Sequence, residues 1–246
     1  MTVSLPKIVT PEYTVQLKSI KAPVRFRPYL VKEEKVLLTA KETDDPTEID
    51  RAVRQILREC TFNALDIDKL PSFDIELLFL QLRARSVNNI IEVRYQCQNK
   101  VDDNETRCGT VNAVRIPVDD IKIETPEGHT NIVQLTDDIT LQLRYPTVET
   151  VKEIIVNGRV SPSLSSHLVA SCIQSMVTKD GTVYETQDYP KDELIAFVES
   201  LSIQQIDKLQ VFFNTMPFIR YETTFQCSKC GYEEPLVYEG INDFFD

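Results

Sequence analysis

Apolar residues recur at helical spacing in seven segments of the chain. The clearest segment follows Asp45 and Pro46, where an N-cap residue precedes proline at the first helical position. Its apolar side chains fall on one face and its charged side chains on the other, which is the pattern of an amphipathic helix. The helices predicted in this way span residues 32–40, 46–60, 73–85, 148–156, 162–176, 194–201 and 203–216.

Two segments carry apolar side chains for which contact with a partner is one of two interpretations. In the helix predicted at residues 73–85, apolar side chains cover most of the circumference, so it is either the central helix of a domain or in part an interface for another chain. Residues 242–246 pair acids with Phe244 and Phe245. They are interpreted as a frayed terminus or as a docking segment for a partner.

Strand signals lie between and around these helices. Alternating or β-rich residues bounded by turn signals predict antiparallel strands at residues 13–20, 24–26, 90–95, 110–117, 132–145, 183–184, 219–225 and 235–238. Helices and hairpins together predict an α+β fold.

The predicted fold has three regions. Residues 1–90 form an N-terminal hairpin plus helices. Residues 91–146 and 218–246 form a β-hairpin region, and residues 147–217 form a helical insertion between its two halves.

Four cysteines lie in two short patterns that resemble each other. Cys97 and Cys227 each follow an aromatic residue and glutamine, and Cys108 and Cys230 each precede glycine. The second pair has the Cys-x-x-Cys-Gly spacing of a zinc-ribbon knuckle, whereas residues 98–107 separate the first pair. The shared flanks predict that all four cysteines belong to one site.

Four thiolates from two hairpins would form a closed tetrahedral site for one structural zinc ion. Such a site leaves no coordination position for water or substrate, so it favours a scaffold over a catalyst. Zinc is preferred to an iron–sulfur cluster because paired ribbon knuckles suit a redox-silent ion. The alternatives are that Cys227 and Cys230 act alone or that the thiols are free.

The other thiols argue against a disulfide framework. Cys60 and Cys172 fall in apolar helical stripes, which is typical of buried core thiols. Residues 1–7 lack the apolar segment of a secretory signal, so a reducing compartment is expected.

Composition narrows the class of function. The net charge of -11 opposes binding to nucleic-acid phosphates and to anionic membranes, and no apolar run is long enough to span a bilayer. The six glycines are scattered, whereas phosphate-binding loops need clustered glycines before a helix. We therefore expect a soluble protein that binds neither nucleotides, nucleic acid nor membranes.

No catalytic group stands out. The chain has two histidines, His129 in a predicted loop and His167 in a predicted helix. Ser166 and His167 are neighbours on a helix, so they point apart and cannot act as nucleophile and base for each other. The protein is therefore not expected to be an enzyme.

Several stretches resemble one family, the baseplate hub proteins of T-even-like tailed bacteriophages. The stretches are RFRPYLVKEEK at residues 25–35, LDIDKLPSFDIE at residues 65–76, FVESL at residues 197–201 and FFNTMP at residues 212–217, together with the cysteine half-sites. The spacing of Cys97 and Cys108 departs from the usual knuckle.

The resemblance implies a late, non-enzymatic phage protein that helps to build the central hub of a contractile-tail baseplate, as a resident subunit or as an assembly chaperone. It implies contacts with other hub proteins and leaves the tape-measure protein and self-association open. It also implies host cytoplasm during assembly, with the virion tail baseplate as the final location of a resident subunit. The alternative from another class is a zinc-ribbon module that binds nucleic acid, which the acidic composition opposes.

Overall fold

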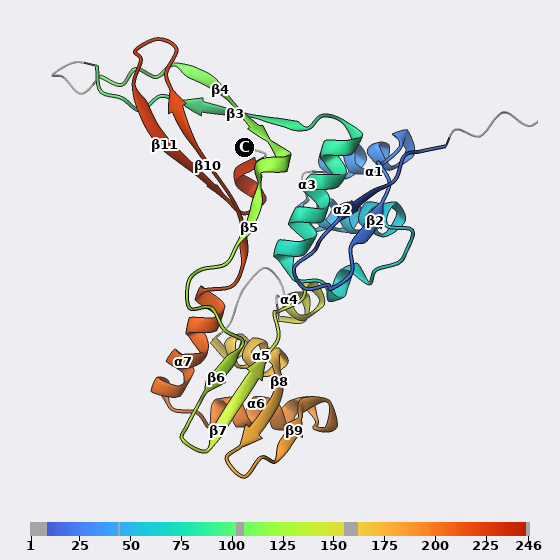
Figure 1. Cartoon of the computed structure of the whole chain (residues 1–246), viewed down its shortest axis with the longest axis vertical. Helices are drawn as coiled ribbons and strands as arrows, with labels where there is room; N and C mark the ends of the chain where they lie inside the picture. The colour runs from blue at the N-terminus through green and yellow to red at the C-terminus, as the bar shows by residue number, and fades with distance from the viewer. Residues whose placement is uncertain (1–8, 44, 102–105, 155–161, 245–246) are drawn as a thin grey trace, which may run out of the picture. The chain divides into compact units, whose positions relative to one another are not determined.

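The computed structural model describes residues 9–43, 45–101, 106–154 and 162–244 of the 246-residue chain. The chain folds into two compact units (Figure 1). Unit 1 comprises Met1–Ile67, Phe73–Ile123 and Ile219–Asp246, and unit 2 comprises Asp68–Ser72 and Glu124–Phe218. In sequence, most of unit 2 is thus an insertion within unit 1.

Unit 1 combines helices with three small sheets. The helices are α1 (Val31–Glu42), α2 (Pro46–Cys60) and α3 (Ser72–Ser86). The strands are β1 (Tyr13–Val15), β2 (Val24–Phe26), β3 (Ile90–Gln96), β4 (Val111–Pro117), β5 (Lys122–Glu124), β10 (Phe218–Gln226) and β11 (Glu233–Glu239). β1 pairs with β2 and β3 pairs with β4, both antiparallel, while the third sheet has the order β11-β10-β5.

The core of unit 1 joins α3 to the strand pairs. Leu80 and Ala84 of α3 pack in one cluster with residues of β3, β4, β10 and β11. Leu78 and Leu82 of the same helix are also almost fully buried. α3 is therefore a central helix of its unit, and it shares a core with the cysteine hairpins.

The C-terminal segment is part of this core. Phe244 is 1% exposed, and its ring centroid lies 5.9 Å from that of Tyr238. The expectation that this phenylalanine belongs to a frayed end or is free to dock on a partner is wrong, because the unit buries it. Phe245 lies outside the described residues.

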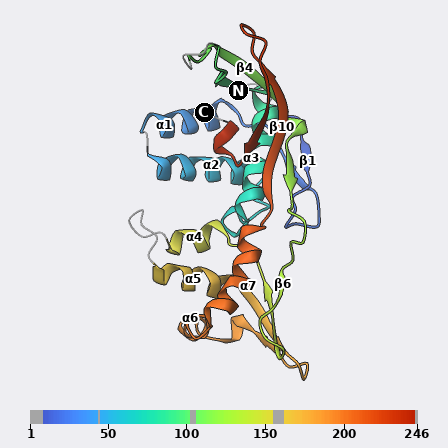
Figure 2. The ribbon, with the colours of Figure 1, turned by 90° about the vertical axis from the view of Figure 1, so that its left-hand side faces the viewer.

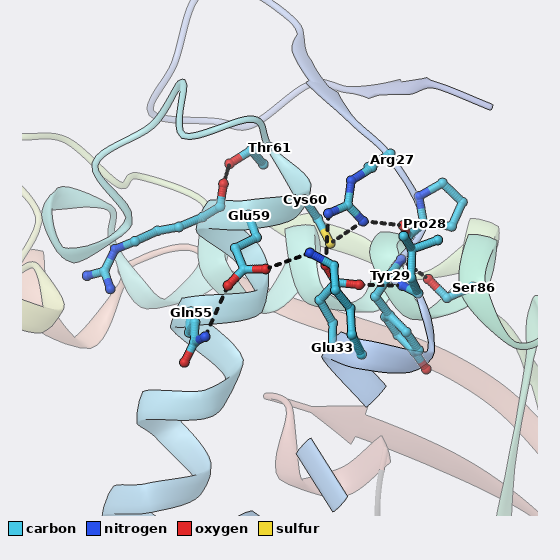
Figure 3. A network of polar contacts seen from close by, with 12 residues as sticks. Arg27, Pro28, Tyr29, Glu33, Gln55, Glu59, Cys60, Thr61 and Ser86 are labelled. Carbon is cyan, nitrogen blue, oxygen red and sulfur yellow. Dashed lines mark hydrogen bonds and ion pairs between the residues drawn. The ribbon is translucent and has the colours of Figure 1, made fainter. Parts of the chain in front are cut away.

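A charged network ties the ends of β2, α1 and α2 together (Figure 3). The Glu33 carboxylate is 2% exposed and accepts hydrogen bonds from Arg27 Nη2 at 2.9 Å and from the Leu30 N–H at 2.6 Å. Arg27 also lies 3.7 Å, through Nη1, from the sulfur of Cys60. These partners hold the pKa of Glu33 near 2 although burial alone would raise it. The conspicuous stretch at residues 25–35 therefore has a structural role.

Unit 2 is a four-stranded antiparallel sheet with helices packed on one face. Its strands follow the order β6 (Ile132–Gln134), β7 (Ile139–Leu143), β8 (Ile173–Thr178) and β9 (Val183–Glu185). Its helices are α4 (Val148–Ile154), α5 (Pro162–Cys172), α6 (Lys191–Glu199) and α7 (Ile203–Asn214). Leu194, Val198, Leu209 and Phe212 of α6 and α7 share a core with Leu141 of β7, and Figure 2 shows these helices on the same side of the sheet.

The helix starts predicted at α2 and α7 are confirmed. Asp45 Oδ1 accepts the N–H of Thr47 at 2.8 Å. Ser202 and Gln205 form a reciprocal capping box, in which each side chain accepts the backbone N–H of the other residue. Short-range chemistry therefore decided where these helices begin.

The predicted helix at residues 162–176 is wrong in its last four residues. The helix ends at Cys172, and the chain continues at once as β8, in which Ile173 pairs with Leu143 of β7. β-Branched Ile173 and Val177 fit a strand as well as a helix, and cross-strand pairing decides between the two. Of the helix predicted at residues 148–156, the structure describes α4 over Val148–Ile154, and residues 155–156 lie outside the described residues.

The inserted unit begins earlier than residue 147. β6 and β7 belong to the same sheet as β8 and β9, so residues 124–146 fold with the insertion and not with the cysteine hairpins. The insertion contains both strands and helices and is not purely helical, because β7 pairs with β8 and the two strands are separated in sequence by α4 and α5.

Candidate metal centre

The two half-sites share one backbone arrangement. In the first, the N–H of Cys97 donates to the carbonyl of Thr110 at 3.0 Å, and the N–H of Gly109 donates back to the carbonyl of Cys97 at 3.1 Å. In the second, Cys227 bonds in the same way to Tyr232 at 2.9 Å, and Gly231 bonds back to Cys227 at 3.0 Å. Both cysteine–glycine turns are therefore built alike, as their flanking residues predicted.

The long first spacing extends a hairpin and does not disrupt the knuckle. Beyond Cys97, the N–H of Cys108 donates to the carbonyl of Asn99 at 2.8 Å, and the N–H of Val101 donates to Thr106 at 2.9 Å. The chain thus leaves Cys97 along one side of a ladder and returns along the other. Cross-strand pairing brings Cys97 and Cys108 close together, whereas Cys227 and Cys230 are close because only two residues separate them.

Each glycine completes its turn with a left-handed backbone. The φ angle is +65° at Gly109 and +70° at Gly231. We expect Gly231→Ala and Gly109→Ala each to lower the free energy of unfolding by about 1–2 kcal/mol, because a Cβ disfavours this backbone region. Urea denaturation of the metal-free protein checks this, and an unchanged midpoint in both variants would contradict it.

The four sulfur atoms converge on one point. They all lie within 4.8 Å of one another. The closest pairs join the two half-sites, with 3.7 Å between the sulfurs of Cys97 and Cys230 and 3.8 Å between those of Cys108 and Cys227. A tetrahedral zinc ion with Zn–S bonds of about 2.3 Å spaces its sulfurs about 3.8 Å apart. The cluster therefore fits such an ion, and all four cysteines are free of disulfides.

The cluster lies half inside the core of unit 1. Cys97 and Cys227 are 0% and 2% exposed, whereas Cys108 and Cys230 are half-buried. Burial raises the pKa of Cys97 to about 12, while a hydrogen bond from the Cys230 backbone lowers the pKa of Cys227 to about 6. The sulfurs thus hold protons with very different strengths. A divalent cation would displace those protons as it bound.

The sequence pattern does not predict three polar side chains that lie near the sulfurs. The Thr110 hydroxyl lies 3.3 Å from the sulfur of Cys108, Asn99 lies beside Cys230, and Asn112 lies beside Cys227. Asparagine and threonine are common in turns for local reasons, so only the pairing of the hairpins reveals this arrangement.

Comparison with known proteins decides the family. Residues 10–246 match the family described as T4 bacteriophage base plate protein. The chain belongs to this family. No curated protein and no solved structure matches it. As a phage baseplate protein, it has a structural or assembly role in the tail baseplate, where it contacts other baseplate components. The described part of this baseplate protein contains no helix long and apolar enough to cross a membrane.

The remaining cysteines of the baseplate protein are buried core thiols outside the sulfur cluster. Cys60 and Cys172 are both 0% exposed. Burial raises their pKa values to about 11 and about 12, which suppresses the nucleophilic thiolate.

The histidines also have structural surroundings. In unit 2, His129 bonds Thr215 through Nδ1 and Tyr145 through Nε2, both at 2.9 Å, and stacks on Phe212. Both of its ring nitrogens are thereby engaged in hydrogen bonds. His167 is half-buried in α5 beside Ser166.

Proposed function

We propose that this baseplate protein is a non-enzymatic component of the central hub of a contractile tail, acting as a resident subunit or as an assembly factor. The family match over residues 10–246 carries the baseplate role. The hub role is supported by the resemblance of residues 25–35 and 65–76 to hub proteins. Other hub proteins are the partners that this role implies, and the tape-measure protein is a further candidate.

We further propose that one structural zinc ion joins the two cysteine hairpins. The supporting observation is the convergence of four sulfurs, from two hairpins of unit 1 that flank the insertion in sequence, at the spacing of a tetrahedral ion. All four positions around such an ion are taken by protein. The ion would therefore stabilise the fold and would neither activate water nor bind substrate.

The absence of catalysis is part of the same proposal. The buried thiols Cys60 and Cys172 and the doubly bonded His129 favour structural roles for the groups most suited to chemistry. A subunit without a catalytic site would act through the surfaces that contact its partners.

The hub role is tested in infected cells with a tagged copy of the protein. We expect quantitative mass spectrometry to find it in purified baseplate hub intermediates together with other hub proteins. Presence in finished particles as well would mark a resident subunit, and absence from them would mark an assembly factor. Recovery only with peripheral baseplate parts would refute the hub role and leave the family assignment intact.

A further inference from the structure

The side chains that surround the sulfur cluster come from one hairpin. Asn99 Nδ2 lies 3.7 Å from the sulfur of Cys230, and Asn112 Nδ2 lies 3.8 Å from the sulfur of Cys227. Both asparagines belong to the hairpin of β3 and β4, while both cysteines belong to the knuckle between β10 and β11. Among the described residues, the side-chain amides that donate to the cluster thus reach across from the first half-site to the second.

Asn112 makes a second link to the same knuckle. Its Oδ1 accepts the N–H of Ser228 at 3.0 Å and the Ser228 hydroxyl at 2.7 Å. Its Nδ2 also donates to the carbonyl of Thr110 at 3.0 Å. These bonds fix the orientation of the amide, so that its oxygen faces Ser228 and its N–H groups face Thr110 and Cys227.

We propose that Asn99 and Asn112 are positioning residues for the metal, which hold the sulfurs of the second knuckle in place for coordination. The inference rests on the proposed zinc site. Four thiolates around a divalent cation carry a net charge of about -2. N–H donors directed at the sulfurs offset that charge and orient the ligands, and loss of such an outer partner typically weakens metal binding about 10–100-fold.

Substitution of Asn112 with aspartate keeps the acceptor that binds Ser228 and removes the N–H donor. In Asn112→Asp, one carboxylate oxygen still accepts both groups of Ser228, but the other oxygen faces the sulfur of Cys227 and the carbonyl of Thr110 and can donate to neither. We expect this variant to weaken zinc binding about 10–100-fold. Ser228→Ala removes one bond to Asn112 without touching a sulfur, and we expect its zinc affinity to stay within about threefold of that of the unchanged protein.

Asn99 provides an independent test. Its carbonyl bonds Cys108 through the backbone, and this bond survives substitution. Asn99→Ala therefore removes the donor to Cys230 alone, and we expect about a 10-fold loss in zinc affinity.

Gln96→Glu is the charge control for Asn112→Asp. It adds one negative charge at an exposed side chain that bonds the Gly109 carbonyl and no sulfur.

The measurement is the zinc dissociation constant of the full chain, obtained by competition with a chromophoric chelator. The thermal melt of each metal-free variant and the sulfur-to-metal absorption bands of its Co²⁺ form are recorded alongside. We expect Asn112→Asp and Asn99→Ala to weaken zinc binding and shift the Co²⁺ bands. The metal-free melt of Asn99→Ala should stay close to that of the unchanged protein, whereas that of Asn112→Asp should fall slightly because the bond to the Thr110 carbonyl is lost.

Two results would overturn the inference, and they have different consequences for the zinc site. If the unchanged protein binds zinc and both asparagine variants bind it equally well, the positioning role fails and the zinc site stands. If the unchanged protein binds neither zinc nor Co²⁺, both the inference and the proposed site fail. Should Asn112→Asp not fold, Asn99→Ala alone decides between these results.

Discussion

Protein purified in metal-free buffer is expected to carry one zinc ion per chain, and Cys227→Ser is expected to lose it together with much of the stability of unit 1. Cys227 is 2% exposed and lies 3.8 Å from Cys108 across the cluster. Structural zinc sites contribute about 10–16 kcal/mol of apparent binding free energy in small zinc-binding peptides, so their loss has large effects. Elemental analysis by mass spectrometry and thermal melts of both proteins check this.

Cys60→Ser is the matched control for the zinc experiment. Cys60 is as buried as Cys97 but lies outside the sulfur cluster. This variant is expected to keep its zinc and to lose about 1 kcal/mol through the buried hydroxyl. An unchanged protein without metal, and a Cys227→Ser variant with an unchanged melt, would refute the four-cysteine site.

Glu33→Gln is expected to lower the free energy of unfolding by about 3 kcal/mol at pH 7. It leaves the guanidinium of Arg27, whose side chain is 13% exposed, without its carboxylate partner. The exposed Lys32, which also lies 3.0 Å from Glu33, adds little because its charge is screened by water. Urea denaturation of both proteins measures the difference.

The effect of Glu33→Gln should depend on pH in one direction. The pKa of Glu33 is lowered from 4.5 to about 2 in the folded protein. The stability that the carboxylate contributes is therefore complete above about pH 4.5 and is lost as the pH falls toward 2. The two proteins should converge in stability across that window. Glu34→Gln, at the exposed neighbouring position, should change stability by less than about 0.5 kcal/mol, and an equal loss in both variants would refute the network as the cause.

Local chemistry explains which elements could be predicted. Asp45 with Pro46, and Ser202 with Gln205, act within one helical turn, so their helices begin where the sequence indicates. The end of α5 depends instead on the pairing of Ile173 with Leu143, far away in sequence. Apolar spacing cannot report such a partner, so it does not reveal the switch from helix to strand.

The same distinction holds at the sulfur cluster. Matching flanks were enough to group Cys97 and Cys108 with Cys227 and Cys230, because aromatic, glutamine and glycine neighbours mark the turn itself. They could not show how residues 98–107 are accommodated, since that depends on a ladder of cross-strand bonds. Nor could they single out Asn112, which acquires its role only when the second knuckle lies beside it.

The separation of the half-sites also sets an order in time. Cys97 and Cys230 are 133 residues apart in the chain, and the whole of Glu124–Phe218 lies between them. At about 5–20 residues per second, a ribosome needs roughly 7–27 s to add those 133 residues. During this interval the first hairpin has open thiols, and the inserted unit is complete in sequence once Phe218 has been added, shortly before Cys230. The contact between the two half-sites is therefore among the last that a newly made chain can form.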